Sequence, residues 1–142
     1  MGGVREVLTD TGFYYLLADP RGRDYETAYS FRQYYLENGY SFVLTDLIFA
    51  ELILRIRYDL DWEKAVTIGN LILAAPEYVI VDGTGYNKEA AWRDFFLKYH
   101  DKRFSFTDCV SFQVMLERGV NKVITVDRDF DRVGKGFLPD YL

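Results

Sequence analysis

The sequence predicts an α/β fold, in which a mainly parallel sheet carries helices on both faces. Short apolar runs of strand length alternate along the chain with longer segments of helical periodicity. The apolar runs are nearly continuous rather than alternating, which is typical of strands that are buried on both faces. Right-handed crossovers between parallel strands then restrict the order in which these strands lie in the sheet.

The predicted strands are short and end at polar residues or turns. They cover residues 4–9, 40–44, 78–81 and 123–126, with a short last strand at 137–138. The first is followed by Asp10, Thr11 and Gly12, and the fourth by Asp127. In open parallel sheets, the carboxyl ends of the strands form the edge at which ligands bind. The two aspartates are therefore expected at that edge.

The predicted helices have recognisable boundaries. They cover residues 13–18, 24–37, 46–58, 61–73 and 87–100, and a further helix begins near Asp108. Thr45 is a suitable N-cap for the helix at 46–58, and either Ser105 or Thr107 is suitable for the helix at Asp108. Residues 129–136 are polar and are predicted to form a loop.

The helix predicted at 46–58 is apolar nearly all round, so we expect it to be buried or covered by a partner chain. Glu51 is its one interior acid. A lone charge in such surroundings costs several kcal/mol or more, so a partner or ligand for it is expected. The alternative is an ordinary ion pair with Arg55, one turn later.

Composition limits the classes of function. The 142 residues contain no evident linker, so a single domain spanning residues 1–142 is expected. The net charge of −5 argues against a broad, non-specific nucleic-acid binder. One Cys and one His exclude an intramolecular disulfide and a multi-histidine metal site within one chain. No apolar run is long enough to span a membrane, and a reducing cytoplasm is the expected location.

Four acids are expected near one edge of the sheet. Asp10 and Asp127 follow the first and fourth strands, Glu51 lies early in the helix after the second strand, and Asp108 begins the helix before the fourth. Clustered carboxylates either raise one another's pKa or hold cations. Ligation by oxygen alone favours Mg²⁺ or Mn²⁺. Two such ions about 3.5–4 Å apart can activate a water molecule for attack on a phosphodiester.

Each acid also has an ordinary interpretation when it is taken singly. Asp10 is equally suited to a turn or helix cap, Asp108 to a favourable interaction with a helix dipole, and Asp127 to a solvated loop. Thr125 and Thr107 are candidates for orienting carboxylates, with capping or packing as the alternative. Arg128, Arg132 and Lys135 follow Asp127 and suit either RNA phosphates or a solvated surface.

Four segments, in this order along the chain, give a resemblance to PIN-domain proteins of the VapC toxin type. The matching stretches are Leu8-Thr9-Asp10-Thr11-Gly12, Thr45-Asp46-Leu47-Ile48-Phe49-Ala50-Glu51-Leu52, Phe104-Ser105-Phe106-Thr107-Asp108-Cys109 and Ile124-Thr125-Val126-Asp127-Arg128-Asp129-Phe130. The resemblance implies a three-layer α/β/α sandwich with strand order 3-2-1-4-5. It also implies that Asp10, Glu51, Asp108 and Asp127 form an acidic quartet.

Two details of the resemblance concern single residues. Gly12 stands where such proteins commonly carry Ser or another small polar residue, which removes a hydroxyl but no metal ligand. Asp129 competes with Asp127 for the fourth position of the quartet. Asp127 is preferred because the Thr-x-Asp-x-x-Phe spacing matches.

The predicted function is a Mg²⁺- or Mn²⁺-dependent endoribonuclease that hydrolyses RNA phosphodiester bonds. Asp10 and Asp108 are the expected direct ligands, and Glu51 and Asp127 complete the site. The resemblance implies a VapB-like antitoxin as partner and a homodimer. Two alternatives are a PIN nuclease of RNA processing or decay without an antitoxin, and a non-catalytic PIN-like module that binds RNA or protein.

Overall fold

The computed structural model describes residues 5–142 and contains a parallel sheet of five strands. The strands are β1 (Arg5–Thr9), β2 (Tyr40–Thr45), β3 (Tyr78–Val81), β4 (Lys122–Thr125) and β5 (Leu138–Tyr141). Their order is β3-β2-β1-β4-β5, and every neighbouring pair is parallel. The expected fold class and strand order are confirmed. The predicted start of the first strand, at residue 4, lies outside the described residues.

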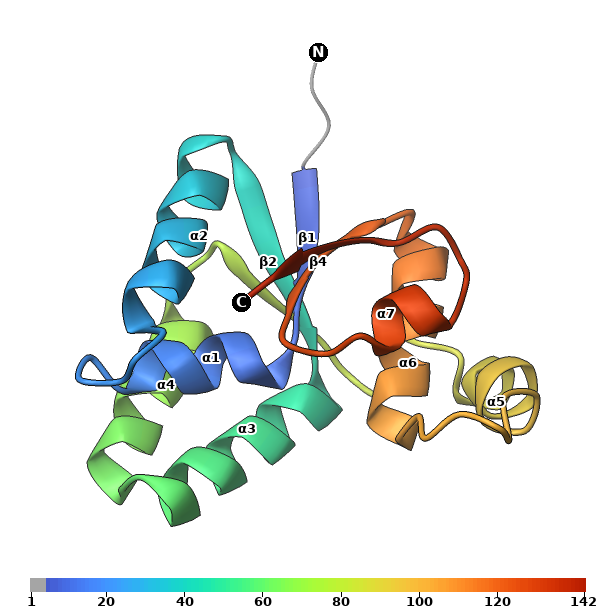
Figure 1. Ribbon diagram of the computed structural model, residues 1–142, viewed down its shortest axis with the longest axis horizontal. Coiled ribbons are helices and arrows are strands. Elements are labelled where there is room, and N and C mark those ends of the chain that lie inside the picture. The colour runs from blue at the N-terminus through green and yellow to red at the C-terminus, as the bar shows by residue number, and fades with distance from the viewer. Residues whose placement is uncertain (1–4) are drawn as a thin grey trace.

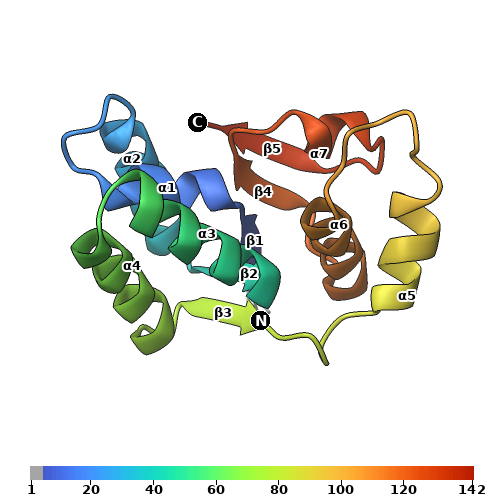
Figure 2. The ribbon, with the colours of Figure 1, turned by 90° about the horizontal axis from the view of Figure 1, so that it is seen from below.

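Helices cover both faces of the sheet (Figures 1 and 2). On one face lie α1 (Thr11–Ala18), α2 (Tyr25–Glu37), α3 (Asp46–Asp59) and α4 (Trp62–Ala74). On the other lie α5 (Lys88–Ala90), the π-helix η1 (Ala91–Phe96), α6 (Phe106–Arg118) and α7 (Asp129–Arg132). No helix in the stretch 5–142 is both long and apolar enough to cross a membrane.

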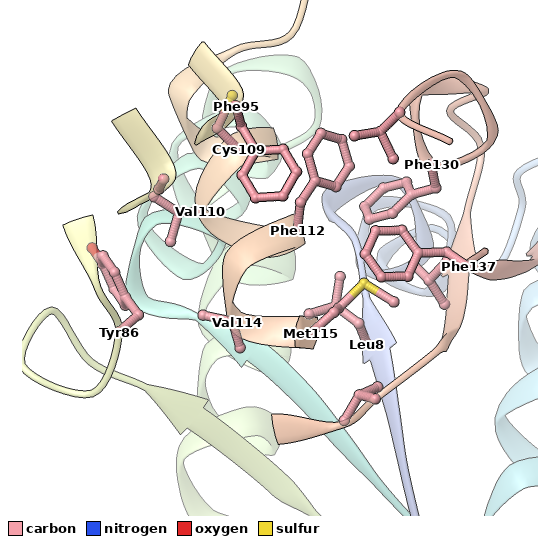
Figure 3. Packing of buried hydrophobic residues seen from close by; sticks show 14 of the residues in the cluster. Leu8, Tyr86, Phe95, Cys109, Val110, Phe112, Val114, Met115, Phe130 and Phe137 are labelled. Carbon is pink, nitrogen blue, oxygen red and sulfur yellow. The ribbon is translucent and has the colours of Figure 1, made fainter. Parts of the chain in front are cut away.

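Alternate residues of each strand face different hydrophobic cores. Val7 packs with α1–α4, whereas its neighbour Leu8 packs with α6 and η1. In β2, Phe42 and Leu44 belong to the first core and Val43 to the second. The second core is rich in aromatic rings around Phe112 (Figure 3). This alternation explains why the strands are apolar at nearly every position.

Side-chain caps determine where several helices begin. Asp10 caps α1, because its Oδ1 accepts a hydrogen bond from the Thr11 amide at 2.9 Å. The helix therefore starts at Thr11, two residues before the predicted start. Thr45 caps α3 as predicted, through the Ile48 amide at 3.1 Å. Ser105, rather than Thr107, caps α6.

The helix predicted over residues 87–100 was partly wrong. It begins as α5 but continues as a π-helix that ends at Phe96, with the Leu97 amide donating to the Trp92 carbonyl at 2.9 Å. Residues 97–102 then form turns and a bend. The apolar spacing of this segment suits any wide helical turn, so it does not distinguish a π-helix from an α-helix.

The C-terminal prediction also needs correction. The predicted loop at 129–136 contains the single-turn helix α7, whose Phe130 is buried in the core. The last strand is Leu138–Tyr141, one residue later and longer than the prediction of 137–138. Phe137 instead fills the core beside Phe112 and Phe130.

Candidate active site

The site lies where the order of strands reverses, between β1 and its neighbour β4. The chain runs from β1 to β2 and β3 on one side, and then returns to place β4 on the other side of β1. Such a switch point opens a crevice at the carboxyl ends of the strands. Asp10 follows β1 at this edge, and its amide donates to the Ile124 carbonyl at 3.1 Å.

Thr125, the last residue of β4, connects two of the predicted acids. Its hydroxyl Oγ1 donates to Asp10 Oδ2 at 2.9 Å and accepts from the Asp127 amide at 2.9 Å. Thr125 is fully buried, so these contacts are shielded from water. Both interpretations left open for Thr125 are present, because its hydroxyl contacts the Asp10 carboxylate and also accepts from a backbone amide, as a cap does.

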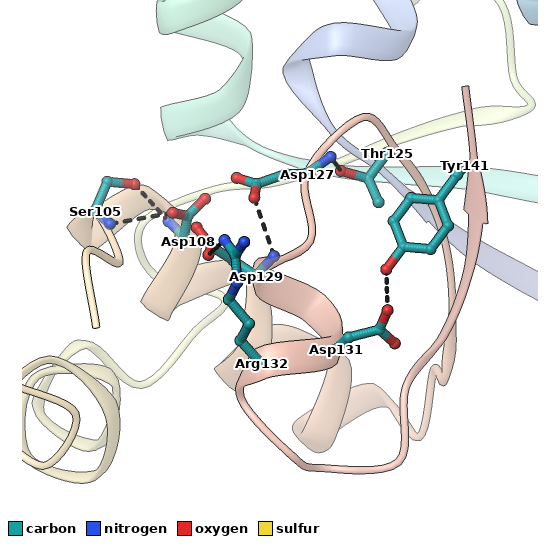
Figure 4. Close-up of polar contacts among 8 residues, drawn as sticks. All are labelled: Ser105, Asp108, Thr125, Asp127, Asp129, Asp131, Arg132 and Tyr141. Carbon is teal, nitrogen blue, oxygen red and sulfur yellow. Dashed lines mark hydrogen bonds and ion pairs between the residues drawn. The ribbon is translucent and has the colours of Figure 1, made fainter. Parts of the chain in front are cut away.

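Three carboxylates converge beside this link (Figure 4). One oxygen from each of Asp108, Asp127 and Asp129 lies within 4.8 Å of the others. The Asp129 amide donates to Asp127 Oδ1 at 3.0 Å, so the turn between β4 and α7 fixes the Asp127 side chain. The two candidates for the fourth acid thus lie together. We call Asp108, Asp127 and Asp129 the carboxylate cluster.

Asp108 reaches the cluster from the first turn of α6. Its Oδ2 accepts from the Ser105 amide at 3.1 Å, and its own amide donates to Ser105 Oγ at 3.0 Å. This capping box holds the carboxylate at the positive end of the helix dipole. The capping role that was an alternative for Asp108 is therefore present, together with its place in the cluster.

Burial and the charges of neighbouring carboxylates raise the pKa of Asp10, Asp108 and Asp129. Burial is the largest cause for Asp108, raising its pKa to about 7, and the charges of Asp10 and Asp127 act in the same direction. Burial also raises the pKa of Asp10, as do the charges of Asp127 and Glu51, whereas hydrogen bonds from Thr11 and Thr125 lower it. The pKa of Asp129 is raised by burial, and its contact with Arg132 opposes that rise.

Glu51 lies on α3 and is exposed, so its prediction as an interior acid was wrong. One face of α3 is buried, through Ile48, Leu52 and Ile56, and Glu51 lies outside that face. The alternative pair with Arg55 is not formed in the described residues, where Arg55 pairs with Asp59 at 3.6 Å. The charge of Glu51 contributes to the raised pKa of Asp10, after burial and the charge of Asp127.

Comparison with known proteins identifies the family. The PIN domain family profile matches residues 7–136, which is most of the chain. The chain belongs to the PIN domain family. A search of curated proteins gave no significant match.

A solved PIN-fold structure aligns with nearly the whole chain. It is the crystal structure of Mycobacterium tuberculosis VapC20, described as a sarcin–ricin loop-cleaving toxin. The TM-score is 0.78 at 20% sequence identity, and the alignment covers 93% of this chain and 96% of that one. At this identity the likeness concerns the fold.

The cluster of this PIN domain has the donor set that a hard divalent cation requires. Two ligands of one Mg²⁺ lie at most about 4.2 Å apart, because each bond is about 2.1 Å long. The upper limit of 4.8 Å between the three oxygens is close to that span. Carboxylates alone, without thiolate or imidazole, suit Mg²⁺ or Mn²⁺. The residues therefore fit such an ion.

Two features of the site were not predicted from the sequence. Asp129 was considered only as a rival of Asp127, whereas both lie in the cluster. Arg132 forms an ion pair with Asp129 at 3.1 Å, one turn along α7. Residues 129–136 lack an apolar period, so the sequence predicts a loop in place of α7, and without a helix the i, i+3 spacing of this pair does not indicate a contact.

Proposed function

We propose that this PIN domain is a divalent-metal-dependent endoribonuclease of the VapC toxin type. The observation that carries the proposal is the convergence of Asp108, Asp127 and Asp129 beside Asp10 at the switch point of the sheet. Four buried or half-buried carboxylates in one crevice repel one another strongly unless a cation compensates them. The fold likeness to a VapC toxin supports the same interpretation.

The cluster residues and Asp10 are the proposed ligands for Mg²⁺ or Mn²⁺. Asp108 and Asp10, from two different elements, would hold the ion, and Asp127, fixed by the turn that contains Thr125 and Asp129, would complete the set. Glu51 is exposed and would act from the rim through water. A bound divalent ion would supply a water of lowered pKa and would stabilise charge on the leaving oxygen.

The protein itself supplies orientation and proton transfer. A carboxylate of the site that does not hold the ion would act as the general base that accepts a proton from the attacking water. Hydrogen bonds from Thr11 and Thr125 hold Asp10 in place. Water then attacks the phosphorus, and the bond from phosphorus to the leaving ribose oxygen breaks.

We propose a VapB-like antitoxin as the protein partner, with a docking groove between α3 and α4. The groove encloses about 230 Å³ and is lined by Phe49, Ile53, Trp62, Val66 and Leu73, among others. Trp62 and Leu73 are 59% and 67% exposed, an unusual share for large apolar side chains. An apolar segment of a partner chain fits this lining. A reducing cytoplasm suits both an RNA substrate and the unpaired, buried Cys109.

A cleavage assay with matched variants tests the nuclease. Wild type should cut RNA with Mg²⁺ or Mn²⁺ and lose activity in EDTA, and a hairpin carrying the sarcin–ricin loop belongs among the substrates. Asp10→Asn, Asp108→Asn and Asp127→Asn should each lower cleavage by about a hundredfold or more. The control is Asp131→Asn, which removes an equal charge from α7 at a carboxylate that accepts from Tyr141 rather than facing the cluster.

The control variant should retain cleavage. Wild type that cuts no RNA with either ion, although it is folded, would leave a non-catalytic binding module as the better interpretation. Cleavage that survives in Asp108→Asn would remove Asp108 from the site.

A further inference from the structure

A cation of the protein itself already contacts the carboxylate cluster. Arg132 Nη1 donates to Asp129 Oδ1 at 3.1 Å (Figure 4). The Arg132 side chain is 58% exposed, whereas that of Asp129 is 12% exposed. A guanidinium on the solvent side therefore stands over a nearly buried carboxylate. Among the ion pairs of residues 5–142, only the Arg132–Asp129 pair includes a carboxylate of the cluster.

The guanidinium and a divalent ion compete for the same group of oxygens. Asp129 contributes one of the three oxygens that lie within 4.8 Å of one another. The hydrogen bond from Arg132 takes up one lone pair of this carboxylate, which leaves fewer for a metal. The positive charge of the guanidinium also repels a second cation at short range. Both effects weaken binding of the ion without blocking the crevice.

The backbone at Arg132 is anchored, whereas its side chain extends into solvent beyond Asp129. Phe130 and Val133, each of which follows one member of the pair, are 1% and 2% exposed and belong to the core. The Arg132 and Val133 amides donate to the carbonyls of Arg128 and Asp129 at 3.0 Å each. The guanidinium can therefore leave Asp129 by side-chain rotation alone, while the carboxylate keeps its place.

We propose that Arg132 is a built-in competitor of the divalent ion, which sets the ion concentration at which the site fills. The inference rests on the proposed function, because it takes the cluster as the metal site. Arg132 neutralises part of the cluster when no ion is bound and is displaced when one enters. Removing the guanidinium should therefore tighten ion binding, which is the opposite of what a supporting residue would do.

The test measures Mn²⁺ binding to the full chain without RNA, by the electron paramagnetic resonance signal of free Mn²⁺. Arg132→Gln should bind Mn²⁺ about tenfold more tightly than wild type. The matched control is Arg128→Gln, which removes the same charge from the same turn. The Arg128 guanidinium lies 3.9 Å from the centre of the Tyr141 ring rather than on a carboxylate. Its removal should change Mn²⁺ affinity by less than about threefold.

A double-mutant cycle separates local competition from general charge. In an Asp129→Asn background, Arg132→Gln should have less than about a threefold effect, because the shared carboxylate is gone. Melting curves in EDTA establish that each variant is folded. Arg132→Met keeps most of the apolar stem and gives the same comparison if the Gln variant does not fold.

If wild type binds Mn²⁺ and cuts RNA, the proposed function stands, and two results would overturn only the inference about Arg132. One is unchanged or weaker Mn²⁺ binding by Arg132→Gln. The other is equal tightening by Arg132→Gln and Arg128→Gln, which would indicate general charge. Wild type could bind no Mn²⁺, or it could bind Mn²⁺ that Asp108→Asn does not displace. In either case the proposed function fails, and the inference fails with it.

Discussion

Thr125 shows how a single buried hydroxyl can organise a site of charged residues. Thr125→Val keeps the shape of the side chain but leaves Asp10 and the Asp127 amide without their partner. We expect a loss of about 1–3 kcal/mol in the free energy of unfolding and a drop in cleavage of about tenfold or more. Urea unfolding and the cleavage assay measure the two effects.

Thr125→Ser supplies the control for that prediction, because it restores the hydroxyl while removing a methyl group. It should recover most of the cleavage activity. If Thr125→Val keeps full stability and full activity, the two hydrogen bonds have no role in positioning the acids.

Asp108 should make the metal-free protein less stable as pH rises. Its pKa is about 7 in the folded protein against an ordinary 3.8, so the folded state holds a proton that the unfolded state has released. Between these two values the folded state binds more protons, and the free energy of unfolding therefore falls as pH increases. Melting temperatures in EDTA should decline from pH 5 to about pH 7 and then level off.

The contrast for Asp108 is Asp108→Asn, which removes the titrating group. Its amide oxygen can still accept from the Ser105 amide, so the capping box survives. The decline with pH should be smaller in this variant, and at pH 7 in EDTA it should be at least as stable as wild type. A variant that melts several degrees lower in EDTA would mean that Asp108 is a structural carboxylate at the start of α6.

The residue scale also shows what a sequence can and cannot predict about a site. Asp10, Asp108 and Asp127 were predictable, because strand ends and helix starts fix their place at one edge of the sheet. The exposure of Glu51 was not, since it depends on which face of α3 the sheet buries. The contacts of Thr125 and Arg132 depend on side-chain directions in a tight turn, which periodicity does not encode.

At the scale of elements, the turn after β4 and the start of α1 are packed against each other. A Cβ atom on Gly12 would lie 2.8 Å from Val126 Cγ2, closer than side chains approach one another. Val126 precedes Asp127, so a shift of the Val126 backbone would move a cluster residue. The lack of room for a Cβ atom therefore explains why this position holds glycine, whereas PIN-domain proteins of the VapC type commonly have Ser there.

This contact predicts a compensating pair of substitutions. Gly12→Ala should lower the melting temperature by several degrees, because overpacking of this kind costs about 1–3 kcal/mol. Val126→Ala, at a side chain that is 51% exposed, should cost little alone and should suppress the effect of Gly12→Ala. Thermal melts of both single variants and the double variant measure the coupling. Strictly additive effects would contradict the contact.

The elements themselves were predicted unevenly, for reasons of burial. β2 and β3 were located well, because strands covered on both faces form continuous apolar runs. The region of η1 was predicted as an α-helix, since Ala91 and Phe95 have a spacing that suits both kinds of turn. At β5, the buried Phe137 was included in the predicted strand, although it enters the core before the strand begins.

At the scale of the whole molecule, the parallel topology separates the proposed surfaces. The carboxylate cluster lies at the switch point between β1 and β4, and the groove for a partner segment lies between α3 and α4. A third surface is the outer side of α3, where Leu54 and Tyr58 lie one turn apart and are 57% and 76% exposed. Neither side chain lines the groove, so a partner there need not compete with the proposed antitoxin.

We propose that a second copy of the chain covers this outer side of α3, so the protein should be a dimer in solution. The mass of one chain is 16.6 kDa. Light scattering at micromolar concentration should give twice that mass. Tyr58→Glu combined with Leu54→Glu should give the monomer, since two charges would be buried unpaired between the chains. Leu97→Glu alters a residue of similar exposure, 54%, beside η1, and should leave the dimer intact. A wild type of monomeric mass, with or without Mg²⁺, would show that this surface of α3 is left to solvent or to another protein.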